Sequence, residues 1–494
     1  MTYILSVDVG TTNVKAVVFD LEGRQVFKSS LRCPVYTPAE GWAEQDPDEV
    51  LNRSLKVVRD CVKAVDGRVE ALTFSAQLYS VMLVDRDGSP LTRILNWMDG
   101  RSVQEASEVS EEMDGYRLYR KTGCHISSMM PVAKLLWLKR HRPERFDKAF
   151  KVLAMKDYLL HRLLGLYVTD RIIASASSLF NIHENRWDPE IAEFLGLSLD
   201  VFPTVVEPDR VVGEVDGPLS ERTGLPKGVP VVCGGGDGML QNIGFGILEP
   251  GLAASNIGTS GAIRVTSNRI ILDKSRRARF FCHALIGDLW CIGGAINSAG
   301  LSLEWFVDRF LDGDFGRFEA EASKAEPGSR GLIFLPYLLG ERAPLWCPEA
   351  KAVFYGLTLN HGIPELSRAV LEGVILALNH IKRVLEAHVP PVREVRTGGG
   401  GARIALLNQV QADVFQVPVY LTATEEGSAL GAAILAAEAL GYYRGLKDAC
   451  KTMVKPVKVF RPNPENVRKY RRVFERYLRL SDALLRLFFR PRPP

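Results

Sequence analysis

A short polar turn between two apolar segments constrains this chain more than any other feature. Residues 4–7 and 16–20 are apolar and rich in β-branched residues, which predicts two β-strands. The segment between them begins at Asp8 and continues through Gly10 to Thr12. Backbone N–H groups and hydroxyls in such a turn can bind phosphate oxygens, and a carboxylate at the strand end can hold a hydrated Mg²⁺. The alternative at this point is an ordinary hairpin with a polar turn.

The length and composition limit the class of protein. A chain of 494 residues is too long for one compact core, so we expect two large domains. Its net charge of +4, without a basic run interleaved with aromatics, argues against a nucleic-acid partner. No apolar stretch is long enough to span a membrane, so we expect no membrane partner. The eight cysteines are scattered without metal-type spacing, which favours reduced thiols and a cytoplasmic location.

A second glycine-rich turn resembles the first one. Residues 250–263 again read as strand, turn and strand, with Gly258-Thr259-Ser260 at the turn. Two similar halves that each begin with a phosphate-binding hairpin predict an α/β fold of two domains with a nucleotide in a cleft between them. We expect the division near residue 245, which gives domains 1–244 and 245–494.

Further glycine-rich turns follow along the chain. Residues 231–238 form an apolar run that ends in three glycines and Asp237. Residues 395–403 predict a strand, a glycine turn and the start of a helix, and such a turn lets a ligand approach the backbone closely. A tight turn without a ligand is the alternative for each cluster. Helical periodicity is clear over three segments, at residues 131–140, 363–387 and 406–415.

These features together favour phosphoryl transfer to an alcohol. The chain has no G-x-x-x-x-G-K-[ST] pattern, no nucleophile elbow and no protein-kinase motifs. Phosphoryl transfer needs positioned phosphates, a metal ion and a carboxylate near the acceptor hydroxyl. Asp237 is our candidate for that catalytic base, and a turn-capping aspartate is the alternative for it.

A second group of polar residues predicts a sugar pocket. Gln77 follows the predicted strand at residues 71–74, and Trp97, Asp99 and Arg101 come soon after it. Trp97 offers a flat apolar face, whereas the other three can form directional hydrogen bonds with sugar hydroxyls. A local ion pair between Asp99 and Arg101 is the alternative, and it is compatible with a role in the pocket.

At this point the chain resembles the FGGY carbohydrate kinases, within the superfamily of actin, hexokinase and the heat-shock chaperones. Both family patterns are present, one from Met129 to Leu138 and one from Ala352 to Glu372. The resemblance covers nearly the whole chain. It implies two ribonuclease-H-like α/β domains around a central cleft, and ATP-dependent phosphorylation of a sugar or polyol.

The resemblance also implies roles for individual residues. Asp8 corresponds to the magnesium-associated acid, and Asp237 to the catalytic base, which also lies at the metal and the substrate. The remaining residues that the resemblance places at the nucleotide are Thr11, Thr12 and Lys15 near the phosphates, Gly258 and Thr259 in the second phosphate turn, and Gly399, Gly400, Ala402 and Asn408 at the adenosine. One departure is Ile404–Leu407, where related kinases often have Ser-Pro-Leu-Trp.

The substrate is predicted from several local similarities. Residues 41–47, 174–181 and 340–346 are more similar to gluconate kinases, which favours D-gluconate. Gln77 and the stretch from Trp97 to Arg101 are closer to xylulose kinases, so D-xylulose or another ketose or polyol is the alternative. The stretch that follows Gln77 lacks the methionine-histidine pair common to both groups.

Two other functions stay open at this point. The first is a nucleotide-driven binding module of the same superfamily, which would bind and slowly hydrolyse ATP without a sugar. The second is a kinase fold that has lost catalysis. The oligomeric state is left open, including a homo-oligomer.

Overall fold

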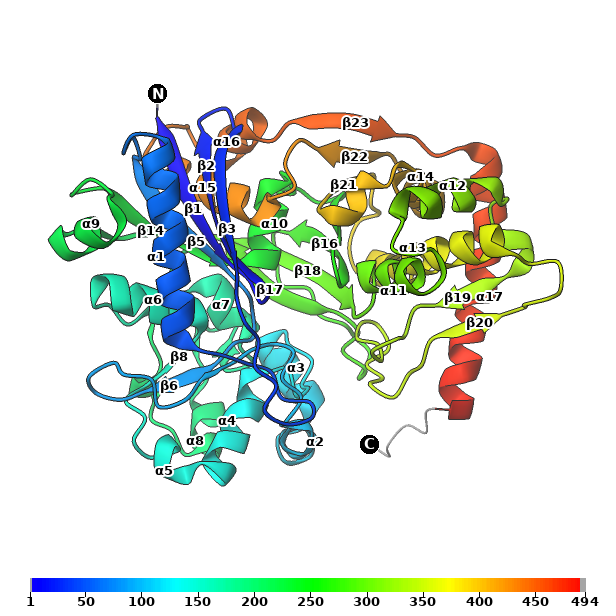
Figure 1. The fold of residues 1–494 in the computed structure, drawn as a ribbon. Coiled ribbons are helices and arrows are strands. Elements are labelled where there is room, and N and C mark those ends of the chain that lie inside the picture. Colours follow the sequence, from blue (N-terminus) through cyan, green and yellow to red (C-terminus); the bar gives the residue numbers. More distant parts are fainter. Residues whose placement is uncertain (1, 489–494) are drawn as a thin grey trace. The chain divides into compact units, whose positions relative to one another are not determined.

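The chain folds into two compact units in a computed structural model that describes residues 2–488 (Figure 1). The N-terminal unit contains the chain up to Leu248 together with Asn268–Cys291 and Glu426–Lys455. The C-terminal unit contains Glu249–Ser267, Ile292–Glu425 and the chain from Pro456 onward. This division differs from the predicted single cut near residue 245, because two later segments fold with the N-terminal unit.

The N-terminal unit is built on a six-stranded sheet with the order β13-β14-β5-β1-β2-β3. β1 pairs with β2 in an antiparallel hairpin, as predicted, and with β5 in parallel, and β5 pairs with β14 in parallel. The strands are β1 (Tyr3–Val9), β2 (Asn13–Asp20), β3 (Gln25–Arg32), β5 (Ala71–Ala76), β13 (Val211–Glu214) and β14 (Pro230–Gly236).

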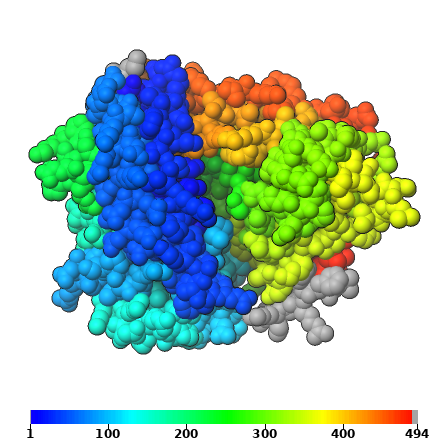
Figure 2. All heavy atoms as spheres, in the orientation of Figure 1, coloured from blue at the N-terminus to red at the C-terminus, as the bar shows by residue number. Residues whose placement is uncertain are grey.

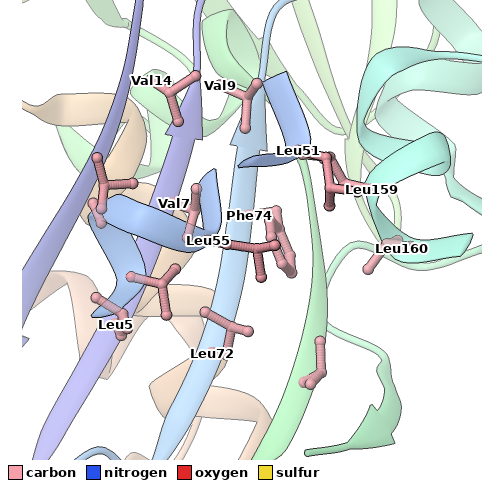
Figure 3. Close-up of a cluster of buried hydrophobic side chains, with 14 of the residues drawn as sticks. Leu5, Val7, Val9, Val14, Leu51, Leu55, Leu72, Phe74, Leu159 and Leu160 are labelled. Atoms are coloured by element: carbon pink, nitrogen blue, oxygen red, sulfur yellow. The ribbon is translucent and has the colours of Figure 1, made fainter. Parts of the chain in front are cut away.

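Helices cover both faces of this sheet. On one face, Leu5, Val7 and Val9 of β1 pack against α1 (Pro47–Ala64), with Leu51 and Leu55 among the buried side chains in Figure 3. α1 begins where the carboxylate of Asp46 accepts the N–H groups of Asp48 and Glu49. Side chains of successive strand residues point to opposite faces, so Ile4 packs into the other layer with α15 (Gly427–Ala439).

The small residues of α15 explain why a late segment folds with the N-terminal unit. α15 lies against α10 (Asp237–Gly244) along much of its length. A Cβ atom at Gly431 would overlap the carbonyl oxygen of Leu240, and one at Gly244 would overlap that of Gly427. The glycines therefore allow two helix backbones to pack directly together, which buries α15 against this sheet.

Smaller elements complete the N-terminal unit. They are β4 (Glu44–Gln45), β6 (Met82–Val84), β7 (Ile94–Leu95), α2 (Val103–Glu112), α3 (Gly115–Thr122), α4 (Pro131–His141), α5 (Pro143–Phe146), β8 (Lys151–Leu153), α6 (Met155–Leu164), β9 (Val168–Asp170), α7 (Arg171–Ala176), β10 (Phe180–Asn181), β11 (Arg186–Trp187), α8 (Pro189–Leu195), the 3-10 turn Leu199–Val201, β12 (Thr204–Val206), α9 (Gly217–Thr223), β17 (Phe281–Ile286) and α16 (Leu446–Met453). α4 confirms the helix predicted from residue 131.

The C-terminal unit repeats the strand pattern of the first. β15 (Leu252–Ile257) forms an antiparallel hairpin with β16 (Gly261–Ser267) and pairs in parallel with β21 (Glu394–Gly398), which pairs in parallel with β22 (Val419–Thr422). β1, β2, β5 and β14 have the same relationships in the N-terminal unit. The sequence-based expectation of two similar halves is therefore confirmed at the level of topology.

The other elements of the C-terminal unit are mostly helices. The long helices α13 and α14 confirm the periodicity in the sequence. The elements are α11 (Gly300–Phe310), α12 (Phe315–Lys324), the 3-10 turn Ser329–Gly331, β19 (Ile333–Leu335), β20 (Val353–Tyr355), α13 (Ile363–Glu386), the 3-10 turn Gly400–Arg403, α14 (Ala405–Phe415), β23 (Pro456–Phe460) and α17 (Pro464–Phe488), and β18 (Leu289–Ile296) crosses the boundary between the units.

The surface of the N-terminal unit includes an exposed edge strand. The first four residues of β3 are all exposed and its last four alternate between half-buried and exposed, and the beginning of the chain forms the dark blue surface in Figure 2. Lys28 and Ser29 interrupt its apolar residues, which is how edge strands avoid pairing with other chains. Within residues 2–488, we find no helix with the length and apolar character needed to cross a bilayer.

We predict that Gly234 is essential for the packing of β14 on β5. Its φ is +68°, and a Cβ atom there would overlap the carbonyl oxygen of Phe74. Gly234→Ala should lower the free energy of unfolding by more than about 3 kcal/mol, measured by urea denaturation. Gly165→Ala is the matched control, because Gly165 has a φ of +72° with open space around it. Gly165→Ala should lower the free energy of unfolding by only about 1–2 kcal/mol. Equal losses of stability in the two variants would contradict the packing argument.

Candidate active site

Three parallel strands bring the predicted catalytic acids to one edge of the N-terminal sheet. The register aligns Asp8 of β1 with Ser75 of β5, and Ser75 with Gly235 of β14. Asp237 follows β14 directly as the first residue of α10. Neighbouring strands lie about 4.8 Å apart, so β1 and β14 are separated by roughly 10 Å. A phosphoryl group and a metal ion fit within that spacing.

Asp8 has the surroundings of a carboxylate that binds a cation. It lies opposite Lys15 across the β1–β2 hairpin. Its Oδ1 atom is buried and has no hydrogen-bond partner among the described residues. Burial raises the pKa of Asp8 above its ordinary value, whereas the ammonium of Lys15 and the hydroxyls of Ser75 and Ser428 act in the opposite direction. A bound cation would satisfy the buried oxygen, so Asp8 fits a Mg²⁺ site.

Lys15 is held by an ion pair with a residue far along the chain. Its Nζ lies 2.8 Å from Oε2 of Glu426, and Nζ of Lys28 lies 3.1 Å from Oε1 of the same carboxylate. Glu426 directly precedes α15 and is nearly buried. The carboxylate therefore neutralises part of the positive charge beside the predicted phosphate turn.

A ring of hydrogen bonds joins the phosphate turn to the predicted sugar pocket. The hydroxyl of Thr11 donates to Oε1 of Gln77 at 2.7 Å and accepts the indole N–H of Trp97 at 2.8 Å. Nε2 of Gln77 donates to Oε1 of Gln45 at 2.6 Å, and Nε2 of Gln45 donates to the carbonyl of Thr11 at 3.0 Å. Thr12, in contrast, is exposed.

Asp99 and Arg101 form the local ion pair that was one of the two predicted alternatives. Arg101 donates through Nε and Nη2 to Asp99 and through Nη2 to Glu44. Its guanidinium lies 3.7 Å from the ring centre of Trp42 and 4.9 Å from that of Trp137, which adds cation–π attraction. Both members of the pair are nearly buried. They stiffen the wall of the predicted pocket through contacts within the protein.

Asp237 occupies the N-terminal turn of α10. It is half-buried, and its Oδ1 accepts the N–H of Gly238 at 2.6 Å. The positive end of the helix dipole stabilises the ionised carboxylate, which is the form that a general base requires. A Cβ atom at Gly236 would overlap the end of the Leu78 side chain, so the preceding glycine leaves room for that side chain.

The C-terminal unit holds the other predicted nucleotide residues at neighbouring strand ends. Asn256 of β15 pairs with Gly398 of β21, so the turns with Gly258 and with Gly399 begin side by side. The N-terminus of α11 supports the first turn, because the N–H of Gly300 donates to the carbonyl of Gly258 at 2.8 Å. Thr259 is exposed, and Gly400 has open space around its Cα.

Asn408 supports the second turn from within the protein. It is buried, and its Nδ2 donates to the carbonyl of Ala402 at 2.7 Å. Nε2 of Gln411 donates to Oδ1 of Asn408 at 3.3 Å. These bonds assign Asn408 a part in shaping the turn at 400–403. Within the described residues, no cluster of three or more His, Cys, Asp or Glu side chains is arranged to hold a metal.

Lys134 is a buried residue of this region, and its contacts were not predicted from the sequence. Its side chain is fully buried, and Nζ donates to the carbonyl of Tyr79 at 2.9 Å and to that of Asn96 at 2.6 Å. It therefore joins the segments that carry Gln77 and Trp97. Burial lowers the pKa of Lys134 to about 7. The only signal in the sequence was its place in the first family pattern.

Tyr79 lies in the stretch after Gln77 that lacks the methionine-histidine pair. Its φ is +62°, which is rare for a tyrosine. Its hydroxyl lies 3.2 Å from Nε2 of His283, a buried residue in the segment Asn268–Cys291. The hydrogen bond from Nζ of Lys134 to the carbonyl of Tyr79 supports this strained backbone.

Comparisons with known proteins agree with this arrangement. Residues 3–244 match the N-terminal domain of the FGGY family of carbohydrate kinases, and residues 253–440 match its C-terminal domain. The chain belongs to the FGGY family of carbohydrate kinases. A gluconokinase of Bacillus subtilis (strain 168) is 34% identical, covering 98% of this chain and 96% of that protein.

Two solved structures share the fold closely. A gluconate kinase from Lactobacillus acidophilus has a TM-score of 0.94, and a ligand-bound xylulose kinase from the same organism has one of 0.95. Each is 31% identical, and each alignment covers 99% of both chains. The resemblance inferred from the two sequence patterns is therefore confirmed, as are the two-domain α/β fold and the carbohydrate kinase class.

We predict that Lys134 gives this FGGY kinase a characteristic pH dependence of stability. Above pH 7 the folded state holds Lys134 neutral, whereas the unfolded chain keeps the proton up to about pH 10.4. The unfolded state then binds more protons, so the contribution of Lys134 to the free energy of unfolding rises with pH by up to about 1.4 kcal/mol per unit. That contribution should be lost in Lys134→Met.

Urea denaturation of both proteins at pH 7 and pH 9 tests this prediction. From pH 7 to pH 9, the free energy of unfolding of the wild type should rise relative to that of Lys134→Met. A constant difference between the two proteins would contradict a lowered pKa for Lys134. Lys382→Met is the control, because Lys382 is also nearly buried but pairs with Glu386.

Proposed function

We propose that this FGGY kinase transfers the γ-phosphoryl group of ATP to a hydroxyl of D-gluconate. The observation that carries the choice of substrate is the 34% identity with a gluconokinase over 98% of the chain. D-xylulose, or another ketose or polyol, is the second candidate. It is favoured by the structural match to a xylulose kinase and by the Trp97–Arg101 stretch.

In this proposal Asp237 is the general base. Its ionised carboxylate accepts the proton of the acceptor hydroxyl as that oxygen attacks the γ-phosphorus, and the bond to the β-phosphate oxygen breaks. The position of Asp237 at a helix N-terminus supports this role, because the dipole keeps the carboxylate ionised. Trp97 supplies an apolar platform for the sugar.

In this proposal Asp8 and Asp237 would hold the Mg²⁺ ion. Mg²⁺ prefers oxygen ligands, and the buried Oδ1 of Asp8 without a described partner offers one. When bound, the ion would neutralise charge on the β- and γ-phosphates of ATP. Lys15 contributes a further positive charge at the phosphates.

The remaining predicted residues bind ATP in this proposal. Thr12 and Thr259 are exposed in the two turns, and their hydroxyls are suited to phosphate oxygens. The N–H of Gly258 is donated to the carbonyl of Ser260, so Gly258 shapes its turn. Gly399, Gly400 and Ala402 bind the adenosine, and the open space at Gly400 supports a close approach of the ligand to the backbone. Asn408 supports this turn from behind.

We also propose that the enzyme acts in the cytoplasm. All eight cysteines are buried free thiols, which suits a reducing compartment.

A coupled ADP-release assay with Mg-ATP tests the proposed substrate. The panel comprises D-gluconate, D-xylulose, L- and D-ribulose, glycerol and erythritol. We expect the highest kcat/KM with D-gluconate. A clear preference for D-xylulose would establish the second candidate. ATP hydrolysis that no sugar stimulates would instead favour a nucleotide-driven binding module.

We predict that Asp237→Asn lowers kcat roughly 10²–10⁴-fold, because the amide cannot accept the proton. Steady-state kinetics measures kcat together with the KM values for sugar and ATP, which separates the loss of the base from weaker binding of sugar or Mg-ATP. The matched control is Asp216→Asn, because Asp216 also lies at the N-terminus of a helix, α9. It follows β13, whose last residue pairs with the first residue of β14, so Asp216 lies at the opposite end of β14 from Asp237. Near-normal turnover in Asp237→Asn would exclude Asp237 as the base.

A further inference from the structure

The direction of every hydrogen bond around Thr11 follows from the chemistry of the groups involved. The carbonyl of Thr11 can only accept, so the side chain of Gln45 must present its NH₂ group there. Oε1 of Gln45 then accepts from Nε2 of Gln77, which leaves Oε1 of Gln77 facing the Thr11 hydroxyl. That oxygen can only accept, so the hydroxyl must donate to it.

The hydroxyl of Thr11 consequently has no proton left for a phosphate. A hydroxyl carries one donor, and phosphate oxygens at the active site need donors. The donor of Thr11 is used by Gln77, and one of its lone pairs accepts the indole N–H of Trp97. Thr12, the next residue, is exposed, and no side-chain hydrogen bond is recorded for it among the described residues.

We infer that the side chain of Thr11 is a positioning residue for the sugar pocket, rather than a ligand of the ATP phosphates. It fixes the indole plane of Trp97 through Nε1 and fixes the amide of Gln77 through Oε1. The phosphates are then left to Thr12 and to the backbone N–H groups of the turn. This inference rests on the proposed function in one respect, because it takes Trp97 as the platform for the sugar.

The ring of hydrogen bonds also connects the phosphate turn with the proposed sugar pocket through one residue, Thr11. Thr11 belongs by its backbone to the phosphate turn and by its side chain to the pocket of Trp97. Gln77 is 2% exposed, so the loss of its hydroxyl partner would leave a buried carbonyl without a hydrogen bond. The orientation of Trp97 and the shape of the turn therefore depend on each other.

The test compares Thr11→Val, which keeps the shape of the side chain and removes the hydroxyl, with Thr12→Val. Steady-state kinetics with the sugar that gives turnover should show the KM for sugar raised roughly tenfold in Thr11→Val, with the KM for ATP within about twofold of wild type. Thr12→Val should show the reverse. Thr11→Ser should restore the sugar KM, because serine retains the donor and the acceptor.

A double-variant experiment tests the mediation by Trp97. Trp97→Phe removes the indole N–H and keeps an aromatic face, and it should raise the sugar KM. Adding Thr11→Val to Trp97→Phe should then raise it by less than the product of the two single effects. A full multiplicative effect would show that Thr11 acts independently of Trp97 and would overturn the inference.

Calorimetry of ATP binding separates this inference from the proposed function. Thr11→Val should bind Mg-ATP with a Kd close to that of wild type, whereas Thr12→Val should bind it more weakly, whichever sugar is the substrate. Weaker ATP binding by Thr11→Val, with Thr12→Val unaffected, would overturn the inference. Absence of sugar-dependent turnover in the wild type would instead contradict the proposed function alone.

Discussion

The parallel pairing of β1, β5 and β14 is the constraint on which the site depends. Parallel strands end at the same edge of a sheet, so this pairing places Asp8, Gln77 and Asp237 together although they are far apart in the sequence. Gly234 and Gly236 allow β14 to pack closely on β5 and Leu78. The distance between Asp8, the proposed metal-binding acid, and Asp237, the proposed base, is therefore set by backbone hydrogen bonds, which are stiffer than side-chain contacts.

Buried polar groups then fix the side chains at this edge. The ring through Thr11 holds Trp97 and Gln77, and Lys134 joins the segments on which they lie. Such groups are costly when unpaired, so a fully paired network favours one arrangement strongly. The proposed sugar pocket is thus held in place by contacts within the protein itself.

The elements that depend on residues close together in the chain could be predicted from the sequence. Alternating apolar residues, glycine turns and helical periodicity predicted the β1–β2 hairpin, α13 and α14, and the acids at strand ends. Partners distant in sequence were not predictable. Glu426 lies 411 residues from Lys15, and its contact depends on the packing of α15. The hydrogen bond from the hydroxyl of Thr11 to Gln77, 66 residues away, is a second contact of this kind.

The most direct test of this account is a crystal structure with Mg²⁺, a non-hydrolysable ATP analogue and the sugar that gives turnover. We predict that one carboxylate oxygen of Asp237 lies within about 3.2 Å of the acceptor hydroxyl, with Asp8 bound to Mg²⁺ directly or through water. The γ-phosphate should lie between them. An acceptor hydroxyl that contacts another acid, with Asp237 remote from both substrates, would contradict the account.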